Sequence, residues 1–291
     1  MAEPVVTRAA AAKINLDLLV TGRRADGYHE LDSLVVFAGI ADTVTAVPGA
    51  GLRLLVDGPF ATQVPTGRDN LVLQAADELA WMMRRTADAT LRLVKRLPIA
   101  AGLGGGSADA AAALSALDAL WGLGLPPERL RDVGLTLGAD VPVCLYGRPA
   151  RMRGVGERLD PVRGLPELPL LLVNPGVQLA TAEVFGALRL PDTLAAREPF
   201  PAHPSVIQLA AWLAASRNDL EVAAIGIAPV IGEALELLRA LPGCHLARMS
   251  GSGPTCWGLF ATERALRLAE ARLAELRPDW WRWAGLIPGA P

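Results

Sequence analysis

The chain has 291 residues, which is enough to bury a large hydrophobic core in one or two domains without disulfides. Its 28 lysines and arginines nearly balance 30 aspartates and glutamates, giving a net charge of −2. This balance, and the lack of a basic tract, argue against nucleic acid as a partner. The most apolar window, residues 110–125, is interrupted by Asp118 and by glycines, so no membrane span is predicted.

Three cysteines, Cys144, Cys244 and Cys256, are scattered along the chain with no C-x-x-C spacing. We interpret them as reduced thiols of a cytoplasmic protein and predict no metal site built from them. The first residues contain Glu3 and no long apolar core, so no signal peptide is expected.

Strands dominate the predicted N-terminal part. The first covers residues 10–21, in which Ile14 and its alternate neighbours face one way while Lys13, Asn15 and Asp17 face the other. A polar turn follows it. Further strands are predicted over 31–40, 42–47, 52–56 and 89–95, with a helix over 70–85.

The middle of the chain favours helices. One is predicted over 107–121, where glycines end it, and another begins at Pro126–Pro127 and ends at Gly138. The apolar run 141–146 predicts a strand.

The C-terminal part alternates between strands and helices. Predicted strands cover 168–173 and 280–289, and a hairpin pairs 246–250 with 256–260. Predicted helices cover 181–188, 206–215, 229–240 and 263–276, with a loop over 194–204. Because strands pair sequentially in both halves, we predict two α+β domains, residues 1–150 and 151–291.

A glycine-rich loop lies between a predicted strand and a predicted helix. Glycines stand at 102, 104, 105 and 106, and Ser107 opens the helix. Unpaired backbone N–H groups at a helix N-terminus attract anions, and glycines let the backbone approach closely, so the pattern predicts a phosphate site. No lysine precedes Ser107, which excludes a Walker A motif, and the spacing does not match a dinucleotide fingerprint.

Four other features are candidates for a functional role, and each also has a purely structural explanation. Lys13 is a candidate because lysine is rare in this arginine-rich chain, and the structural alternative is a solvated strand residue. Asp140 is a candidate acid, or a residue of a helix-stopping turn. Tyr28 and His29 can stack on a flat ring, or fill a turn. Residues 250–253, Ser-Gly-Ser-Gly, suit a ligand between domains, or are turn residues.

Taken in order and spacing, these motifs resemble the galacto-, homoserine, mevalonate and phosphomevalonate (GHMP) kinase superfamily. The resemblance covers almost the whole chain. The blocks Gly27–His29 and 95–98 resemble the member that phosphorylates 4-diphosphocytidyl-2-C-methyl-D-erythritol in the non-mevalonate isoprenoid pathway. The blocks that carry the resemblance are KINL at 13–16, TGRRADGYHEL at 21–31, KRLP at 95–98, GLGGGS at 102–107, GADVP at 138–142 and SGSG at 250–253.

The resemblance implies an α+β, two-domain GHMP-kinase-like fold. It would have an N-terminal ribosomal-protein-S5-like nucleotide-binding domain, a C-terminal ferredoxin-like α/β-sandwich domain and a ligand cleft between them. It also implies a small-molecule acceptor, ATP and Mg²⁺ as cofactors, and a monomer or homodimer. No direct protein ligand of the metal stands out, so Mg²⁺ is expected to be held largely by phosphates and water.

The resemblance also assigns roles to residues. Lys13 and Asp140 would be catalytic. The cytosine of the acceptor would be held by Tyr28, His29 and Phe185, and its methylerythritol end by Asn15, Asp140 and Thr181. Ser250, Gly251, Ser252 and Gly253 would form a C-terminal glycine loop. ATP would be bound by Asn70, Lys95, Pro98, Gly102, Leu103, Gly104, Gly105, Gly106 and Ser107.

These roles predict a mechanism. Phosphoryl transfer has a loose transition state, so the acceptor hydroxyl needs little early activation. A carboxylate is a poor base for an alcohol, so we expect Asp140 to orient the hydroxyl as much as it deprotonates it. Lys13 would fix this carboxylate and help neutralise developing charge.

Two alternatives stay open on sequence alone. One is a sister kinase that phosphorylates homoserine or mevalonate, which offer no base for Tyr28 and His29 to stack on. The other is a catalytically silent nucleotide-binding relative, which would have been free to lose Lys13, Ser107 and Asp140.

Overall fold

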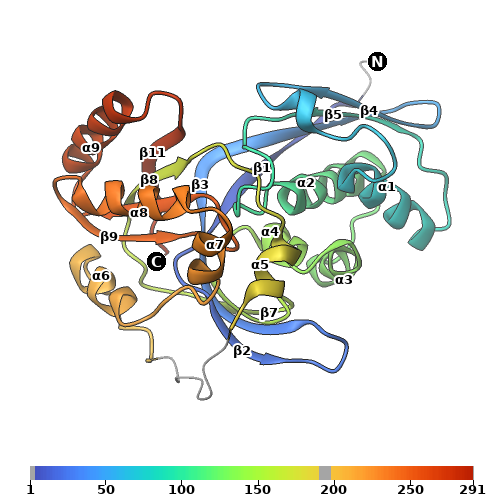
Figure 1. The fold of residues 1–291 in the computed structure, drawn as a ribbon. Coiled ribbons are helices and arrows are strands. Elements are labelled where there is room, and N and C mark those ends of the chain that lie inside the picture. The colour runs from blue at the N-terminus through green and yellow to red at the C-terminus, as the bar shows by residue number, and fades with distance from the viewer. Residues whose placement is uncertain (1–3, 190–197, 291) are drawn as a thin grey trace. The chain divides into compact units, whose positions relative to one another are not determined.

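The computed structural model describes residues 4–189 and 198–290. Figure 1 shows the ribbon, coloured from the N-terminus to the C-terminus. The strands are β1 (Val6–Asn15), β2 (Leu19–Arg23), β3 (His29–Val47), β4 (Leu52–Asp57), β5 (Ala89–Val94), β6 (Ala150–Gly154), β7 (Arg158–Pro161), β8 (Leu168–Asn174), β9 (Cys244–Met249), β10 (Cys256–Phe260) and β11 (Trp281–Ile287). The helices are η1 (Ala61–Gln63, a 3₁₀-helix), α1 (Leu71–Met82), α2 (Gly105–Leu120), α3 (Pro127–Leu137), α4 (Val141–Tyr146), α5 (Thr181–Ala187), α6 (Val206–Ala214), α7 (Glu221–Ile227), α8 (Val230–Ala240) and α9 (Glu263–Leu276).

The chain folds into two compact units that are interleaved in sequence. The first unit contains Met1–Lys13, Ile40–Ile99 and Gly104–Gly147, and the second contains Ile14–Gly39, Ala100–Leu103 and Arg148–Pro291. One boundary, after Gly147, falls close to the boundary predicted near residue 150. The segments 14–39 and 100–103 nevertheless pack with the second unit.

The first unit is built on a β-α-β crossover. Strand β4 leads through α1 into β5, which lies parallel to β4, and β5 pairs on its other side with the end of β3. Helix α2 packs on α1, and both bury apolar faces in one core. The α2 face that enters the core is largely alanine, which lets neighbouring backbones approach closely.

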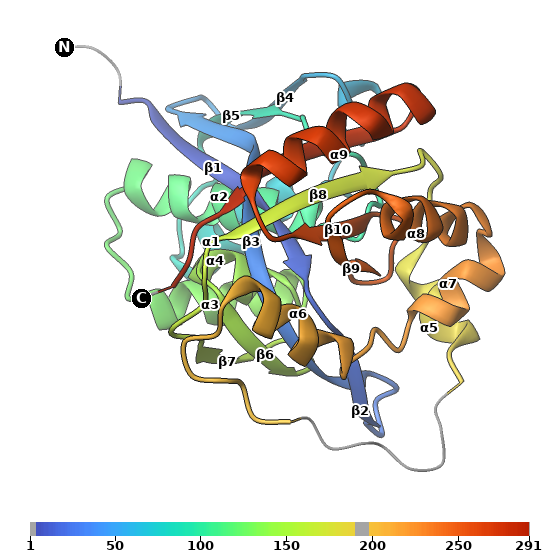
Figure 2. The ribbon, with the colours of Figure 1, turned by 90° about the vertical axis from the view of Figure 1, so that its left-hand side faces the viewer.

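The second unit contains a four-stranded antiparallel sheet in the order β11-β8-β10-β9. Helices α8 and α9 pack on it, as Figure 2 shows, and share one core cluster with Leu171 and Val173 of β8. Strand β8 is buried along its whole length, which explains its continuous apolar sequence. The first part of β3 pairs antiparallel with β2 and with β6, and β6 pairs with β7.

Most predicted elements are confirmed. Strands β4, β5 and β8, the β9–β10 hairpin, the last strand β11, and helices α1, α2, α3, α5, α6, α8 and α9 lie where the patterns predicted them. The α+β fold class is also confirmed. Strands β6 and β7 and helix α7 were not predicted. Part of the predicted loop over 194–204 lies outside the described residues.

The strand predicted over 141–146 is wrong, because these residues form helix α4. Asp140 precedes the helix, Pro142 occupies its first turn, and Gly147 ends it with φ +63°. A six-residue apolar run has no periodicity that separates a buried strand from a buried helical turn.

Two strand boundaries also differ from the prediction. The strands predicted over 31–40 and 42–47 are one continuous strand, β3, and the strand predicted over 10–21 is interrupted between Asn15 and Leu19.

The solvated alternative for Lys13 is wrong as well, because Lys13, Asn15 and Asp17 are all buried. Polar partners on neighbouring elements make that burial possible.

Candidate functional site

Lys13 and Asp140 form a close ion pair in the first unit. Lys13 lies near the end of β1, and its Nζ is 2.6 Å from Asp140 Oδ2. The lysine side chain is 5% exposed, whereas that of Asp140 is 33% exposed. Asp140 stands directly before α4 but makes no capping hydrogen bond with its side chain. The carboxylate is therefore held by the lysine alone among the described residues and stays open to a ligand.

The glycine loop ends against this ion pair. Gly104 has φ +63°, and a Cβ atom there would lie 3.4 Å from Cβ and Cε of Lys13 and 3.8 Å from Asp140 Oδ2. Helix α2 begins at the next residue without a side-chain cap, so its first N–H groups are free to bind an anion. Ser107 lies in this first turn, with Oγ 4.0 Å from where a Cβ on Gly138 would be. The structure thus brings together the predicted phosphate loop, Lys13, Ser107 and Asp140.

Lys95 lies in a different environment. It follows β5 directly and is 2% exposed, with Nζ 2.6 Å from Asp42 Oδ2 and 2.5 Å from Asp109 Oδ2. Asp42 Oδ1 also accepts hydrogen bonds from the backbone N–H groups of Arg96 and Leu97. A Cβ on Gly105 would lie 3.2 Å from the ammonium nitrogen, so this ion triad lies beneath the first turn of α2.

The triad shifts the pKa values of its members. Burial raises the pKa of Asp109 to about 7, against the opposing effect of Lys95 and with the help of Asp42. Burial acts to lower the pKa of Lys95, but the charges of Asp109 and Asp42 outweigh it and hold that pKa above its usual range. Asp109 Oδ1 has no hydrogen-bond partner among the described residues.

Two other residues predicted to bind ATP are also buried. Asn70 is the N-cap of α1: its Oδ1 accepts from the Val72 N–H at 2.8 Å, and its Nδ2 donates to the Pro65 carbonyl at 2.7 Å. Pro98 is buried beside the chain that leads to the glycine loop. The structure thus gives Asn70 a role in starting α1, and its predicted contact with adenosine stays a prediction.

The second unit contains a separate polar cluster around the C-terminal glycine loop, residues 250–253. Ser250 Oγ accepts from the Asn15 N–H at 3.1 Å and donates to the Gly102 carbonyl at 2.9 Å. A Cβ on Gly102 would lie 2.4 Å from the Ser250 carbonyl oxygen, so only glycine fits at this position. Gly102, the first residue of the glycine loop 102–107, therefore lies directly against the C-terminal glycine loop.

The same loop contacts a further predicted acceptor residue. Thr181 Oγ1 lies 2.9 Å from Ser252 Oγ, at the start of α5. Asn218 supports the loop by donating from Nδ2 to the carbonyls of Met249 and Gly251, at 2.9 and 2.8 Å. Residues 250–253 are therefore a buried, hydrogen-bonded turn, and their predicted role in binding a ligand stays a prediction.

Two predicted aromatic residues meet in the second unit. The rings of His29 and Phe185 stack with centroids 5.0 Å apart and an interplanar angle of 22°. Burial, and then the charge of Arg23, lower the pKa of His29, which favours the neutral ring at physiological pH. Tyr28, in the turn before β3, is 62% exposed.

Sequence reasoning missed several residues that hold these groups in place. Asp42 pairs with Lys95, and Ser33 and Trp257 hydrogen-bond to Asn15. These three residues gave no recognisable signal, because their partners lie far away in the chain. Asp109 could have been noticed, since it is an acid two residues after Ser107 on a helix otherwise rich in alanine.

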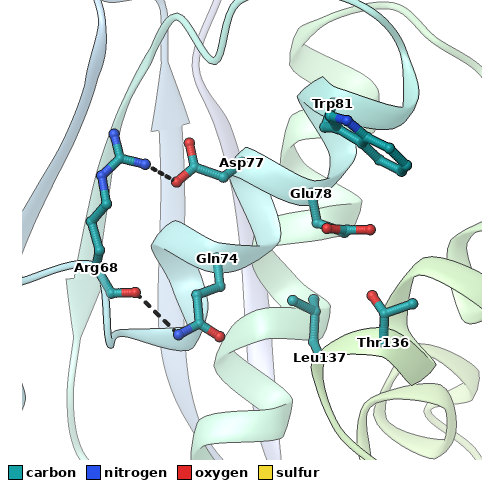
Figure 3. Close-up of a pocket in the computed structure, with 7 residues that line it drawn as sticks. All are labelled: Arg68, Gln74, Asp77, Glu78, Trp81, Thr136 and Leu137. Carbon is teal, nitrogen blue, oxygen red and sulfur yellow. Dashed lines mark hydrogen bonds and ion pairs between the residues drawn. The ribbon is translucent and has the colours of Figure 1, made fainter.

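A surface depression lies elsewhere in the first unit, between α1 and the end of α3. Figure 3 shows the ion pair between Arg68 and Asp77 and the hydrogen bond from Gln74 to the Arg68 carbonyl. Its volume is about 390 Å³, and none of the predicted site residues lines it. The Arg68 side chain is 80% exposed, so water screens the ion pair and it contributes little.

Within residues 4–189 and 198–290, no group of three His, Cys, Asp or Glu side chains could hold a metal ion. No helix in those ranges is both long and apolar enough to cross a membrane.

Comparisons with known proteins agree with this arrangement. Residues 70–148 match the family model for the GHMP kinases N terminal domain, and residues 198–278 match that for GHMP kinases C terminal. A solved homoserine kinase from Cytophaga hutchinsonii aligns over 99% of this chain and 96% of its own, with a TM-score of 0.71 and 17% identity. At that identity the match supports the fold alone, which is that of the GHMP-type kinases.

Relatives of higher sequence identity show which kind of GHMP kinase this chain is. The 4-diphosphocytidyl-2-C-methyl-D-erythritol kinase of Paramagnetospirillum magneticum is 55% identical, over 94% of this chain and 95% of the relative. That of Rhodospirillum rubrum is 49% identical, over 98% and 93%. A crystal structure of 4-(cytidine 5'-diphospho)-2C-methyl-D-erythritol kinase aligns over 98% of this chain and 100% of its own, with 38% identity and a TM-score of 0.76. The chain therefore belongs to the GHMP kinase family and, within it, to the 4-diphosphocytidyl-2-C-methyl-D-erythritol kinases.

This membership confirms the predicted class of enzyme, a phosphotransferase that uses ATP. The sister-kinase alternative is not favoured, because the homoserine and mevalonate kinases that align are 17% identical or less. The roles of the individual residues stay predictions.

Proposed function

We propose that this chain transfers the γ-phosphoryl group of ATP to the 2-hydroxyl of 4-diphosphocytidyl-2-C-methyl-D-erythritol, giving the 2-phosphate and ADP. The observation that carries the proposal is the Lys13–Asp140 ion pair, 2.6 Å long, against the end of the glycine loop. A partly exposed carboxylate beside a phosphate-binding helix terminus is the arrangement that phosphoryl transfer to an alcohol needs.

ATP phosphates would bind at the N-terminus of α2. The free N–H groups of Gly105, Gly106 and Ser107 and the helix dipole favour a negatively charged group there. Gly104 would keep the approach open, because its φ of +63° is a conformation that residues with a side chain rarely adopt. Lys95 would act indirectly, by holding the first turn of α2 from below.

Mg²⁺ is part of this proposal. The described residues contain no acidic cluster that would form a cage for a cation, and Mg²⁺ usually keeps several waters and binds through one or two protein oxygens and substrate phosphates. The Ser107 hydroxyl is the protein oxygen that fits this requirement. When bound, the ion would neutralise charge on the β- and γ-phosphates.

Asp140 would accept a hydrogen bond from the acceptor hydroxyl and take its proton late in the transfer. Lys13 would hold Asp140 Oδ2, leaving the second carboxylate oxygen for the hydroxyl. The lysine charge would also stabilise negative charge that develops on the transferred group. In this division of roles Asp140 orients the hydroxyl as much as it deprotonates it, and Lys13 acts chiefly through its charge.

Aromatic rings of the second unit would hold the cytosine. The His29 and Phe185 rings are in contact at 5.0 Å, so no third ring fits between them and the base would stack on an outer face. The exposed side chain of Tyr28 would cover the base. Asn15 and Thr181, both hydrogen-bonded to the 250–253 loop, would face the methylerythritol end.

The test is ADP release from the purified protein with Mg-ATP and 4-diphosphocytidyl-2-C-methyl-D-erythritol, with homoserine and mevalonate run in parallel. Turnover with the cytidine compound alone, lost in Asp140→Asn, supports both the acceptor and the site. Turnover with another acceptor would overturn the proposed cytidine pocket. ATP binding without any turnover would favour the silent relative instead. The cytoplasmic location and the monomeric or homodimeric state remain predictions from sequence.

A further inference from the structure

Asn15 is a buried amide in which every hydrogen-bonding group but one has a partner. Its side chain is 1% exposed. Its N–H donates to Ser250 Oγ at 3.1 Å, its carbonyl accepts from Trp257 Nε1 at 3.0 Å, and its Nδ2 donates to Ser33 Oγ at 2.7 Å. Asn15 Oδ1 has no partner among the described residues. A buried acceptor without a partner is costly and needs an explanation.

The hydrogen bonds of Ser33 decide which way the Asn15 amide points. Ser33 Oγ lies 2.5 Å from the Asp17 carbonyl oxygen, which can only accept. The single hydroxyl hydrogen of Ser33 is therefore used there, and Ser33 can only accept a hydrogen bond from Asn15. Because only the amide nitrogen can donate, Nδ2 must face Ser33 and Oδ1 must face away.

The Oδ1 side of the Asn15 amide faces a glycine, which has no side chain to crowd it. A Cβ atom on Gly251 would lie 3.3 Å from Asn15 Oδ1 and 3.1 Å from the Gly102 carbonyl oxygen. Gly251 has φ +56°, a conformation that glycine adopts without strain. The unpaired acceptor thus faces the small-residue loop 250–253, whose next serine is hydrogen-bonded to Thr181.

We propose that Ser33 is a positioning residue that fixes the Asn15 amide with Oδ1 as an acceptor for a hydroxyl of the polyol part of the substrate. This inference rests on the proposed function, because it takes Asn15 to face the methylerythritol end. It adds that the contact has a direction: the ligand hydroxyl donates and the amide oxygen accepts. An ether or carbonyl oxygen at the same place would leave Oδ1 unpaired.

The test compares wild type, Ser33→Ala and Ser33→Thr in direct binding titrations. Ser33→Ala frees the amide to rotate, so the affinity for 4-diphosphocytidyl-2-C-methyl-D-erythritol should fall roughly 10-fold, the loss expected for one hydrogen bond. Ser33→Thr keeps the hydroxyl and should restore most of the affinity that Ser33→Ala loses. CDP serves as the matched ligand, because it has the cytidine diphosphate but no methylerythritol, and its affinity should change less than about twofold.

Three outcomes would overturn the inference. The first is that Ser33→Ala binds the full acceptor as tightly as the wild type. The second is that Ser33→Ala loses as much affinity for CDP and ATP as it loses for the full acceptor. The third is that Ser33→Thr unfolds at the wild-type temperature but does not restore the affinity. If Ser33→Ala does not fold, Ser33→Cys keeps the volume but offers only a weak acceptor, and the same titrations apply. Failure of the proposed function is distinguishable, because there the wild type itself would neither bind nor phosphorylate the acceptor.

Discussion

The two lysines of this chain differ in what their surroundings allow them to do. Lys13 faces one carboxylate, Asp140, whose side chain is 33% exposed. Lys95 faces two, Asp42 and Asp109, whose side chains are at most 5% exposed. Both lysines are buried, and both lie near the start of α2.

The number of carboxylate partners and their exposure indicate which lysine acts in the reaction and which one stabilises the fold. An ammonium between two buried carboxylates has its hydrogen bonds committed, and removing it leaves uncompensated charge inside the protein. An ammonium with one partly open partner can share its charge with a ligand that approaches that partner. We therefore expect changes at Lys95 to affect stability first, and changes at the Lys13–Asp140 pair to affect turnover first.

The largest expected effect is that of Lys95→Met. This change removes the cation from between two buried acids, Asp42 and Asp109, which should cost about 3–5 kcal/mol and lower the melting temperature by roughly 10 °C. Thermal unfolding at alkaline pH, well above the pKa of Asp109, measures it. Because the charges are the cause, the double variant Lys95→Met with Asp109→Asn should recover part of the loss. If the double variant loses more than Lys95→Met, the explanation by buried charge is wrong.

Asp140→Asn tests the other side of the comparison. The amide keeps the shape of the side chain but loses its charge and its capacity as a base, so kcat should fall roughly 100-fold or more with little change in KM. The melting temperature should stay within about 2 °C of the wild type. Asp132→Asn, at an exposed aspartate of α3, is the matched control and should keep full activity. A variant with near-normal kcat would remove Asp140 from the mechanism.

Tyr28→Ala should give a third signature, distinct from those of both lysine sites. The loss of one stacking ring should raise the KM for the acceptor roughly 10-fold, while the KM for ATP and the stability stay unchanged. Trp81→Ala removes an aromatic side chain that is 75% exposed on α1 and serves as the control. Steady-state kinetics with each substrate varied in turn would decide. An unchanged KM for the acceptor would count against the cytidine pocket.

A further effect concerns the pH dependence of stability. The pKa of Asp109 is about 7 in the folded protein, raised from 3.8. Between these values the folded protein binds a proton that the unfolded chain has released, so this contribution to stability is lost as the pH rises towards 7. Asp109→Asn has no such proton. From about pH 5 to about pH 8, wild type should therefore lose stability relative to the variant, and parallel unfolding curves would contradict the raised pKa.

Local patterns were sufficient for most of the helices and for the phosphate loop. The run of helix formers after Gly106 predicted α2, and the glycines before Ser107 predicted an anion site, because both depend on residues adjacent in the chain. The order of several such motifs also sufficed for the family resemblance that the comparisons confirm. Residues 141–146 show the limit, since a short apolar run fits a strand and a helical turn equally well.

The sequence by itself determined the fold class, the kind of reaction and the candidate residues Lys13, Asp140 and Asn15. Only the tertiary structure decided how each is held. Asp42 follows Lys13 by 29 positions and precedes Lys95 by 53, yet it is bonded to Lys95 and not to Lys13. Ser33 fixes Asn15 across the chain in the same way. Hydrogen bonds and ion pairs act over a few ångströms in space, so partners distant in sequence become visible only after the chain has folded.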